Sequence, residues 1–237
     1  ASSASVAVSA TAQRSKGSSA VVPCTTRGTK RWMPQVAPSS SGAGLGQARS
    51  RAVTTTSTGA TSNGQLPRSV SAVDVHLMPG SYHSEEGADD LVAGAIYDNR
   101  LAVSSFGLMG HNLDDIGQTV SRYVRERWPE FAPRGILDLG CTVGHNTGPW
   151  TDQFPDAEVH AIDVAAPCLR YALARARSQG RAIHFHQMNA EALEFPDAGF
   201  DLVFSSMFLH EVPRAGIARV LREAHRVLRP GDLMLHM

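Results

Sequence analysis

Short apolar runs alternate with helix-length segments along the second half of the chain. Four runs bounded by turn residues predict buried strands, at residues 135–139, 158–162, 183–186 and 200–204. A fifth strand is expected to start at 233–235. Because these runs are mostly apolar and do not alternate strictly with polar residues, they indicate strands covered on both faces of a sheet.

The segments between these runs have helical periodicity. A helix is predicted from about 145 to 154, and a second one closes at Gly180. The clearest amphipathic helix follows the fourth strand, with Pro230-Gly231 expected to end it. Its apolar positions are Ile217, Val220, Leu221, Ala224, Val227 and Leu228. Strands and helices alternating in this way predict an α/β fold with a doubly wound parallel sheet, which is Rossmann-like.

Upstream of the sheet, residues 72–133 predict a helical N-terminal lid segment. After the capping signal Asp114-Asp115, a helix is expected to end before Pro129 and Pro133. Its apolar face consists of Ile116, Val120, Tyr123, Val124 and Trp128. The chain therefore divides into a tail (1–71), the lid segment (72–133) and a sheet-forming core (134–237).

The tail differs from the rest in charge. Residues 1–73 contain eight bases and no acid, so the remainder has 22 − 8 = 14 bases against 22 acids. A Ser-, Thr- and Arg-rich stretch of this kind is expected to be disordered, because it buries too little apolar surface. It is typical of a transit peptide for a mitochondrion or plastid. A plain disordered tail or a translated upstream region stays open, and the location would then be cytoplasmic.

Several classes of protein are disfavoured by the composition. No stretch approaches 18 apolar residues, so no membrane span is expected. The basic tail has few aromatic residues, and nucleic acid is not the expected partner. Three widely spaced cysteines suggest neither a disulfide framework nor a zinc site. His184 and His186 point to one face of a strand as a metal pair would, but a third ligand is not evident, so no metal is expected.

A glycine turn directly follows the first strand. Asp138 ends the apolar run, and Gly140 and Gly144 permit a tight turn in which a ligand approaches bare backbone. A dinucleotide site needs G-x-G-x-x-G and a P-loop needs G-K-[ST], and neither pattern is present. A cofactor with a nucleoside but no phosphates fits this turn better.

These residues resemble the class I S-adenosylmethionine-dependent methyltransferases, in the broad small-molecule (type 11-like) branch. Asp138, Gly140 and Gly144 match the family's first motif, and Thr142 replaces its middle glycine. The helix-to-strand junction around Leu228-Arg229-Pro230-Gly231 also resembles the family. Members continue past the fifth strand to a seven-stranded sheet, so the resemblance implies a sheet truncated at this point.

The resemblance implies a set of cofactor-binding residues. Asp163, an acid at the end of the second strand, would accept hydrogen bonds from the ribose hydroxyls, or alternatively cap the next helix. Asn189 would meet the adenine amino group and the N–H of Ala190 a ring nitrogen. Ser205 belongs to the family's fourth-strand motif. The cofactor-binding set is therefore Asp138, Gly140, Thr142, Gly144, Asp163, Asn189, Ala190 and Ser205.

We therefore expect a methyltransferase that uses S-adenosylmethionine to methylate a small molecule. His210, in the turn that would face the transferred methyl group, is the candidate general base, and simple packing is the alternative. Tyr82, His83 and Tyr97 of the lid segment are further candidates for contact with the substrate or cofactor. A non-catalytic methyltransferase-like binding protein and a nicotinamide-dependent oxidoreductase are the alternative functions. No pattern in the sequence indicates an oligomeric state.

Overall fold

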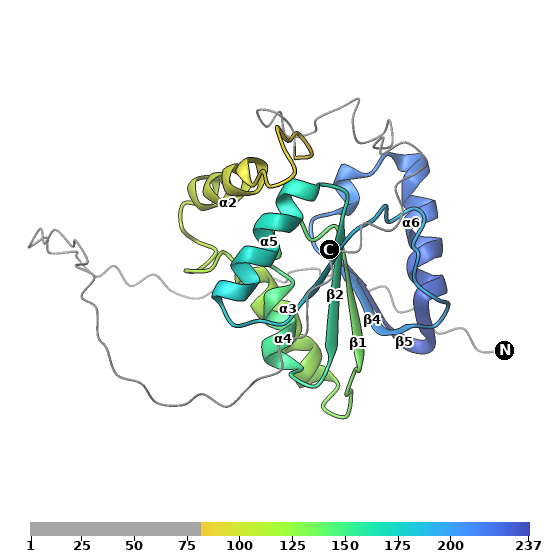
Figure 1. Ribbon diagram of the computed structural model, residues 1–237. Helices are drawn as coiled ribbons and strands as arrows, with labels where there is room; N and C mark the ends of the chain where they lie inside the picture. The colour runs from red at the N-terminus through yellow and green to blue at the C-terminus, as the bar shows by residue number, and fades with distance from the viewer. Residues whose placement is uncertain (1–81) are drawn as a thin grey trace, which may run out of the picture. The chain divides into compact units, whose positions relative to one another are not determined.

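Five parallel strands form one sheet in the order β3-β2-β1-β4-β5 (Figure 1). The strands are β1 (Gly135–Leu139), β2 (Glu158–Asp163), β3 (His184–Gln187), β4 (Phe200–Ser205) and β5 (Leu228–His236). The strand order reverses beside β1, as in doubly wound folds, which places a ligand crevice at the carboxyl ends of β1, β2 and β4. The predicted parallel α/β sheet is confirmed.

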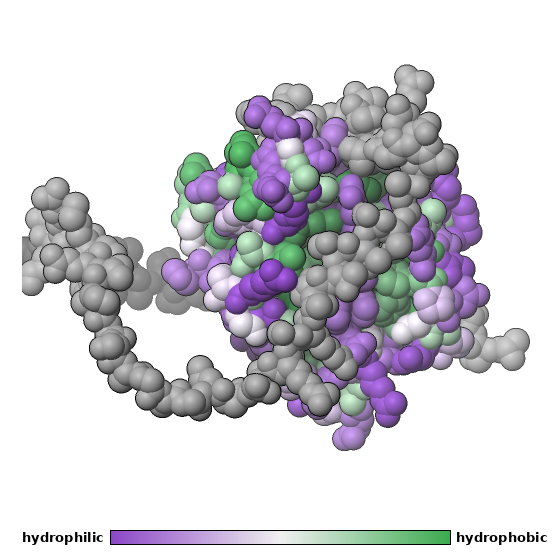
Figure 2. All heavy atoms as spheres, viewed as in Figure 1, coloured by the Kyte–Doolittle hydropathy of each residue, from purple (hydrophilic) through white to green (hydrophobic). Residues whose placement is uncertain are grey.

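The computed structural model describes residues 82–237. The expected tail and residues 72–81 of the lid segment lie outside the described residues. Within 82–237, no helix is both long enough and apolar enough to cross a membrane. On the face of these residues that Figure 2 shows, hydrophilic and hydrophobic residues are interspersed.

Helices cover both faces of the sheet. They are α2 (Val92–Ser104), α3 (Asp115–Arg127), α4 (Gly148–Gln153), α5 (Ala166–Ser178) and α6 (Arg214–Val227), with a short 3₁₀ helix η1 (Leu209–Glu211). Ile136 packs on the face that α3, α4 and α5 cover, whereas its neighbour Leu137 packs against α6 on the other face. Because successive strand side chains point to opposite faces, two covered faces require both positions to be apolar.

The last helix and strand meet earlier than the sequence indicates. Leu228, predicted at the end of α6, instead begins β5 and pairs with Phe200. Pro230 disfavours a helical conformation in the residue before it, so the chain is extended from Leu228 onward. The next paired residues are Leu202 and Leu233, and the register shift between these two pairs accommodates the Pro-Gly step within the strand. The helix therefore ends at Val227, before the predicted Pro230-Gly231 stop, and β5 begins five residues before its predicted start at Leu233.

Helix α3 differs from its prediction on two counts. Tyr123, predicted on the apolar face, is exposed. Val124 is buried as predicted, and Val120 and Trp128 pack against the core. Gly117 and Ser121 are buried as well, because small residues bring this helix close to the glycine turn. Asp114 precedes the helix as expected, but its side chain makes no capping hydrogen bond.

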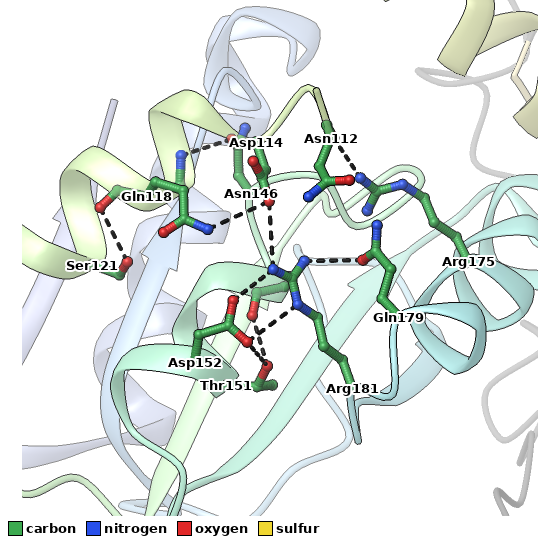
Figure 3. Close-up of polar contacts among 12 residues, drawn as sticks. Asn112, Asp114, Gln118, Ser121, Asn146, Thr151, Asp152, Arg175, Gln179 and Arg181 are labelled. Atoms are coloured by element: carbon green, nitrogen blue, oxygen red, sulfur yellow. Dashed lines mark hydrogen bonds and ion pairs between the residues drawn. The ribbon is translucent and has the colours of Figure 1, made fainter. Parts of the chain in front are cut away.

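The Asp114 carboxylate instead joins a polar network around Arg181 (Figure 3). The Arg181 guanidinium donates to Asp152 of α4 at 2.5 Å and to Gln179 at 3.0 Å, and lies 3.5 Å from Asp114. One buried cation therefore links the start of α3, the end of α4 and the loop after α5.

The lid segment contains helix α2, which docks on α5. A Cβ on Gly94 would lie 2.4 Å from the Cβ of Tyr171, so only glycine permits this approach. Ala93 and Ile96 of α2 pack with Val143 of the glycine turn and with Cys168 of α5. Helix α2 therefore lies over the carboxyl end of the sheet.

Candidate functional site

A cavity of about 380 Å³ opens at the carboxyl ends of β1, β2 and β4. This volume falls within the range of small-molecule sites, roughly 300–1,000 Å³. The strand ends, the turn after β4 and helix α2 all contribute to its wall. Its lining includes Tyr97, Arg100, Leu101, Asp138, Gly140, Thr142, Asp163, Met188, Asn189, Ala190, Phe208 and Glu211.

The glycine turn forms the floor of this cavity. Gly140 has φ +75°, and a Cβ there would lie 2.3 Å from Cδ2 of Phe208, so a side chain is excluded on both counts. The backbone N–H groups of Gly140 and Cys141 both donate to the Ile162 carbonyl, at 2.9 and 3.0 Å. These bonds fix the turn to the end of β2.

Thr142 takes the conformation that the family's middle glycine would supply. Its φ is +50°, in the left-handed region. Its backbone N–H donates at 2.9 Å to Oδ2 of Asp163, which compensates part of the strain. The departure from the glycine pattern therefore leaves the shape of the turn intact.

Asp163 is held by backbone groups on both carboxylate oxygens. Oδ2 accepts from Thr142, and Oδ1 accepts from the N–H of Ala165 at 2.9 Å. Burial raises the pKa of Asp163, and the N–H donors oppose that shift. Each oxygen keeps a second lone pair, so the carboxylate can still accept hydrogen bonds from ligand hydroxyls.

Asp138 is a second buried acid in the same wall. Its carboxylate accepts a hydrogen bond from the Thr147 hydroxyl at 2.5 Å. Burial raises the pKa of Asp138 to about 7, and the nearby charge of Asp163 adds to the shift. Among the cavity-lining residues that the structure describes, Arg100 is the one Lys or Arg. The floor of the cavity therefore favours a ligand that brings positive charge or hydroxyl donors.

The loop after β3 forms another wall. Met188 donates its backbone N–H to the Asp163 carbonyl at 3.0 Å, which brings the two strand ends together. Oδ1 of Asn189 accepts from the N–H of Glu191 at 2.9 Å. Met188, Asn189 and Ala190 all line the cavity, and Met188 also packs in the core.

The structure brings six of the nine predicted site residues into this one cavity. They are Asp138, Gly140, Thr142, Asp163, Asn189 and Ala190. A Cβ placed on Gly144 would lie 3.5 Å from the Phe185 ring, and the Ser205 hydroxyl is buried 2.8 Å from Nδ1 of His236. His210 forms an ion pair with Glu211 at 3.2 Å, and in this part of the chain Glu211, rather than His210, lines the cavity. The cofactor contacts of these residues and the catalytic role of His210 stay predictions.

Helix α2 contributes residues that sequence reasoning missed. Tyr82, His83 and Tyr97 line the cavity, as considered from the sequence, but Arg100 and Ser104 had no assigned role. Tyr97, Arg100, Leu101 and Ser104 are spaced i, i+3, i+4 and i+7. This spacing defines one helical face, so a periodicity argument extended to polar residues would have identified them.

Asn146, in the glycine turn, also lines the cavity without a predicted role. Its side chain accepts from the N–H of Gly117 at 3.0 Å and donates to the Ser206 hydroxyl at 3.0 Å. It therefore connects the turn to α3 and to the end of β4.

His184 and His186 do not form a metal centre with a third ligand within residues 82–237. His160 of β2 lies between them instead, with its ring stacked on both. Its Nδ1 lies 3.0 Å from Nε2 of His186.

Comparison with known proteins relates this chain to methyltransferases. Residues 136–231 match the family model described as a methyltransferase domain. A malonyl-[acyl-carrier protein] O-methyltransferase of Pseudescherichia vulneris is 32% identical over 140 residues, covering 58% of this chain and 53% of that protein. A demethylmenaquinone methyltransferase of Thermus thermophilus is 36% identical over 106 residues, covering 45% and 47%. The chain thus spans about half the length of the curated relatives it matches.

A solved structure shares the fold. A Methanococcus maripaludis protein described as an S-adenosyl-L-methionine-dependent methyltransferase aligns with a TM-score of 0.51 at 17% identity, covering 64% of this chain and 66% of that chain. At this identity the likeness shows the fold alone.

Proposed function

The chain belongs to the class I S-adenosylmethionine-dependent methyltransferases through its domain at 136–231, and on that premise we propose that it methylates a small acceptor bound beneath α2. The observation that carries this proposal is the position of Asp163. Its buried carboxylate lies beside the turn at Gly140–Thr142 and in the same cavity as Asn189 and Ala190.

The described residues fit this cofactor. S-adenosylmethionine carries two ribose hydroxyls, an adenine, and positive charge on its sulfonium and ammonium groups. Asp163 would hold the hydroxyls, Asn189 and Ala190 would hold the adenine, and Asp138 would face the positively charged end. A cofactor without phosphates also suits a cavity floor that carries the carboxylates of Asp138 and Asp163.

The cofactor, when bound, supplies a methyl group already activated on a sulfonium. Asp163, Asn189 and Ala190 would hold the cofactor so that this methyl group faces the acceptor, and no other activating group would be needed. The protein's contribution is therefore alignment and exclusion of water. Helix α2 covers the cavity, so its residues would align the acceptor.

An acceptor that carries a carboxylate is supported by Arg100. This cation lines the cavity, and no ion pair or hydrogen bond to another side chain in 82–237 involves it. The name of the relative from P. vulneris implies a malonyl acceptor, which presents a carboxylate. A carboxylate is already deprotonated, so its methylation needs no general base.

A quinol is the second candidate, from the name of the relative from T. thermophilus. The apolar wall formed by Leu101, Met109 and Ile116 would suit a ring of this kind.

Calorimetry with S-adenosylmethionine and with NAD separates the proposal from an oxidoreductase. Turnover with labelled cofactor is then measured on a malonyl thioester and on a demethylated naphthoquinol. Micromolar binding of S-adenosylmethionine with turnover of either acceptor supports methyl transfer. Binding of NAD alone refutes it, and cofactor binding without turnover of any acceptor in a broad panel supports a non-catalytic binding protein.

A further inference from the structure

A buried imidazole in the glycine turn is paired with a carboxylate of the lid helix. Nε2 of His145 lies 2.6 Å from Oδ1 of Asp98, although the two residues are 47 positions apart. The His145 side chain is only 4% exposed. The second oxygen of Asp98 accepts from the Tyr171 hydroxyl of α5 at 2.7 Å. Asp98 therefore joins three elements: α2, the turn and α5.

The charges of this pair follow from its surroundings. Burial lowers the pKa of His145, and the positive charge of Arg175 adds to that effect, against the opposing influence of Asp98. Burial would raise the pKa of Asp98, but hydrogen bonds from Tyr171 and His145 outweigh it and lower the pKa. An ionised carboxylate only accepts hydrogen bonds, so Nε2 of His145 carries the proton and donates.

The pair lies directly behind the cavity wall. The neighbouring residue Tyr97 stacks on the His145 ring, with centroids 6.1 Å apart. Burial raises the pKa of Tyr97, and the side chain of Thr142, the strained residue of the turn, opposes that shift. His145, Tyr97 and Thr142 all line the cavity. Helix α2 thus approaches the turn at two places, at the His145 ring and beside Thr142.

We propose that Asp98 is a positioning residue that acts through His145, coupling the docking of α2 to the shape of the cofactor-binding turn at 140–147. When the Asp98–His145 hydrogen bond forms, α2 covers the cavity and the turn takes its binding conformation in the same step. When it breaks, a buried donor on the turn is left without its acceptor, and both elements loosen. Loss of the lid therefore weakens cofactor binding as well as acceptor binding. This inference rests on the proposed function for the identity of the ligand.

The test compares variants of the whole chain in two measurements. Hydrogen exchange of ligand-free protein follows peptides that cover 140–148 and 92–104, and calorimetry follows the binding of S-adenosylhomocysteine. Asp98→Ala removes the acceptor, and Asp98→Asn keeps a neutral one. The matched control is Glu85→Gln, which removes the ion pair from Arg170 that anchors the lid segment at another point.

Asp98→Ala is expected to speed exchange in the turn as well as in α2, and to weaken S-adenosylhomocysteine binding about 10-fold, as for one charged hydrogen bond. Asp98→Asn should weaken S-adenosylhomocysteine binding by only about 3-fold, because the neutral hydrogen bond that it keeps is roughly half as strong as a charged one. Glu85→Gln should leave exchange in the turn at its parent rate.

The proposal is overturned if Asp98→Ala and Glu85→Gln give the same exchange in 140–148 and the same affinity. If the parent protein fails to bind S-adenosylhomocysteine, the proposed function is wrong, and the exchange comparison by itself still decides whether Asp98 orders the turn.

Discussion

The Thr147 hydroxyl donates a 2.5 Å hydrogen bond to the carboxylate of Asp138, and both side chains are buried. Asp138 is the second-to-last residue of the central strand β1, and Thr147 comes directly before α4. This bond therefore spans the glycine turn between them and closes it as a loop. It also opposes the rise in the pKa of Asp138 that burial causes.

Thr147→Val is expected to destabilise the fold by about 1–3 kcal/mol, because it leaves a buried carboxylate without its donor. Urea unfolding at neutral pH measures the loss. Thr151→Val is the matched control, since it removes a hydroxyl bond to the Gly148 carbonyl in the same helix at a less buried position. An equal cost for the two variants would contradict a special role for the Asp138 pair.

Gly140→Ala should destabilise the protein by more than the strain of an alanine in the left-handed conformation. The strain of an alanine at positive φ is about 1–2 kcal/mol, and at this site the new Cβ would also overlap the Phe208 ring. Gly180→Ala provides the control, because φ there is +69° but no atom lies within 4 Å of the new Cβ. We expect a larger drop in melting temperature, and weaker cofactor binding, for Gly140→Ala only. Similar drops in melting temperature for the two variants would contradict the prediction, because they would show that the Phe208 ring moves away from the new Cβ without cost.

The sequence was sufficient for the sheet because both faces are covered. Ile136 and Leu137 point to opposite faces and both are buried. A central strand of this sheet therefore has a continuous apolar run in its sequence. The floor of the site was also predictable, since Gly140 directly follows β1, Asp163 ends β2, and parallel strands present their carboxyl ends at one edge.

The remaining errors have tertiary causes. Leu228 continues the helical periodicity of α6 but is taken into β5 by its pairing with Phe200, and periodicity carries no signal for such pairing. The contact between Asp98 and His145 depends on how α2 docks, and that docking depends on a close approach at Gly94. Contacts between distant segments of this kind are not encoded in local spacing.

The histidine cluster on β2 and β3 predicts a pH dependence of stability. Burial lowers the pKa of His160 to about 4, and the charges of His184 and His186 add to this, while Glu158 opposes it. Since the folded pKa lies below the ordinary value of about 6.5, the unfolded chain binds more protons between these values. The contribution of His160 is therefore present above pH 6.5 and is lost as the pH falls through 4.

Asp138 titrates in the same pH range with its pKa raised, so its contribution to stability changes with pH in the opposite direction. The prediction therefore concerns the difference between the parent protein and a His160 variant. His160→Phe keeps an aromatic ring but cannot be protonated. Relative to the parent, it should gain about 1–3 kcal/mol of unfolding free energy between about pH 7 and pH 4.5. Urea unfolding at both pH values measures this. The exposed His225→Gln is the control, and a parallel pH dependence of parent and His160→Phe would contradict the prediction.

His210 remains the predicted general base for an acceptor that must lose a proton. Its partner Glu211 lines the cavity, so the pair reaches the site through the carboxylate. With a quinol acceptor, His210→Ala should lower kcat by roughly 10²-fold or more, and with a carboxylate acceptor it should change kcat little. Glu211→Gln distinguishes the two members: if it alone abolishes the pH dependence of kcat, the base is Glu211 and the assignment to His210 is wrong.

Asp163 allows the cofactor role and the capping role to be separated. Its carboxylate accepts from the N–H of Ala165 at the start of α5, so Asp163→Ala loses a helix cap as well as a ligand contact. Asp163→Asn keeps an oxygen for that N–H but loses the charge. We expect both variants to bind S-adenosylmethionine about 10- to 100-fold more weakly, as for the loss of charged hydrogen bonds to two hydroxyls. Only Asp163→Ala should lower the melting temperature markedly. Calorimetry below the melting temperature of each variant gives the affinities, and parent-like affinity in Asp163→Asn would leave Asp163 with the capping role alone.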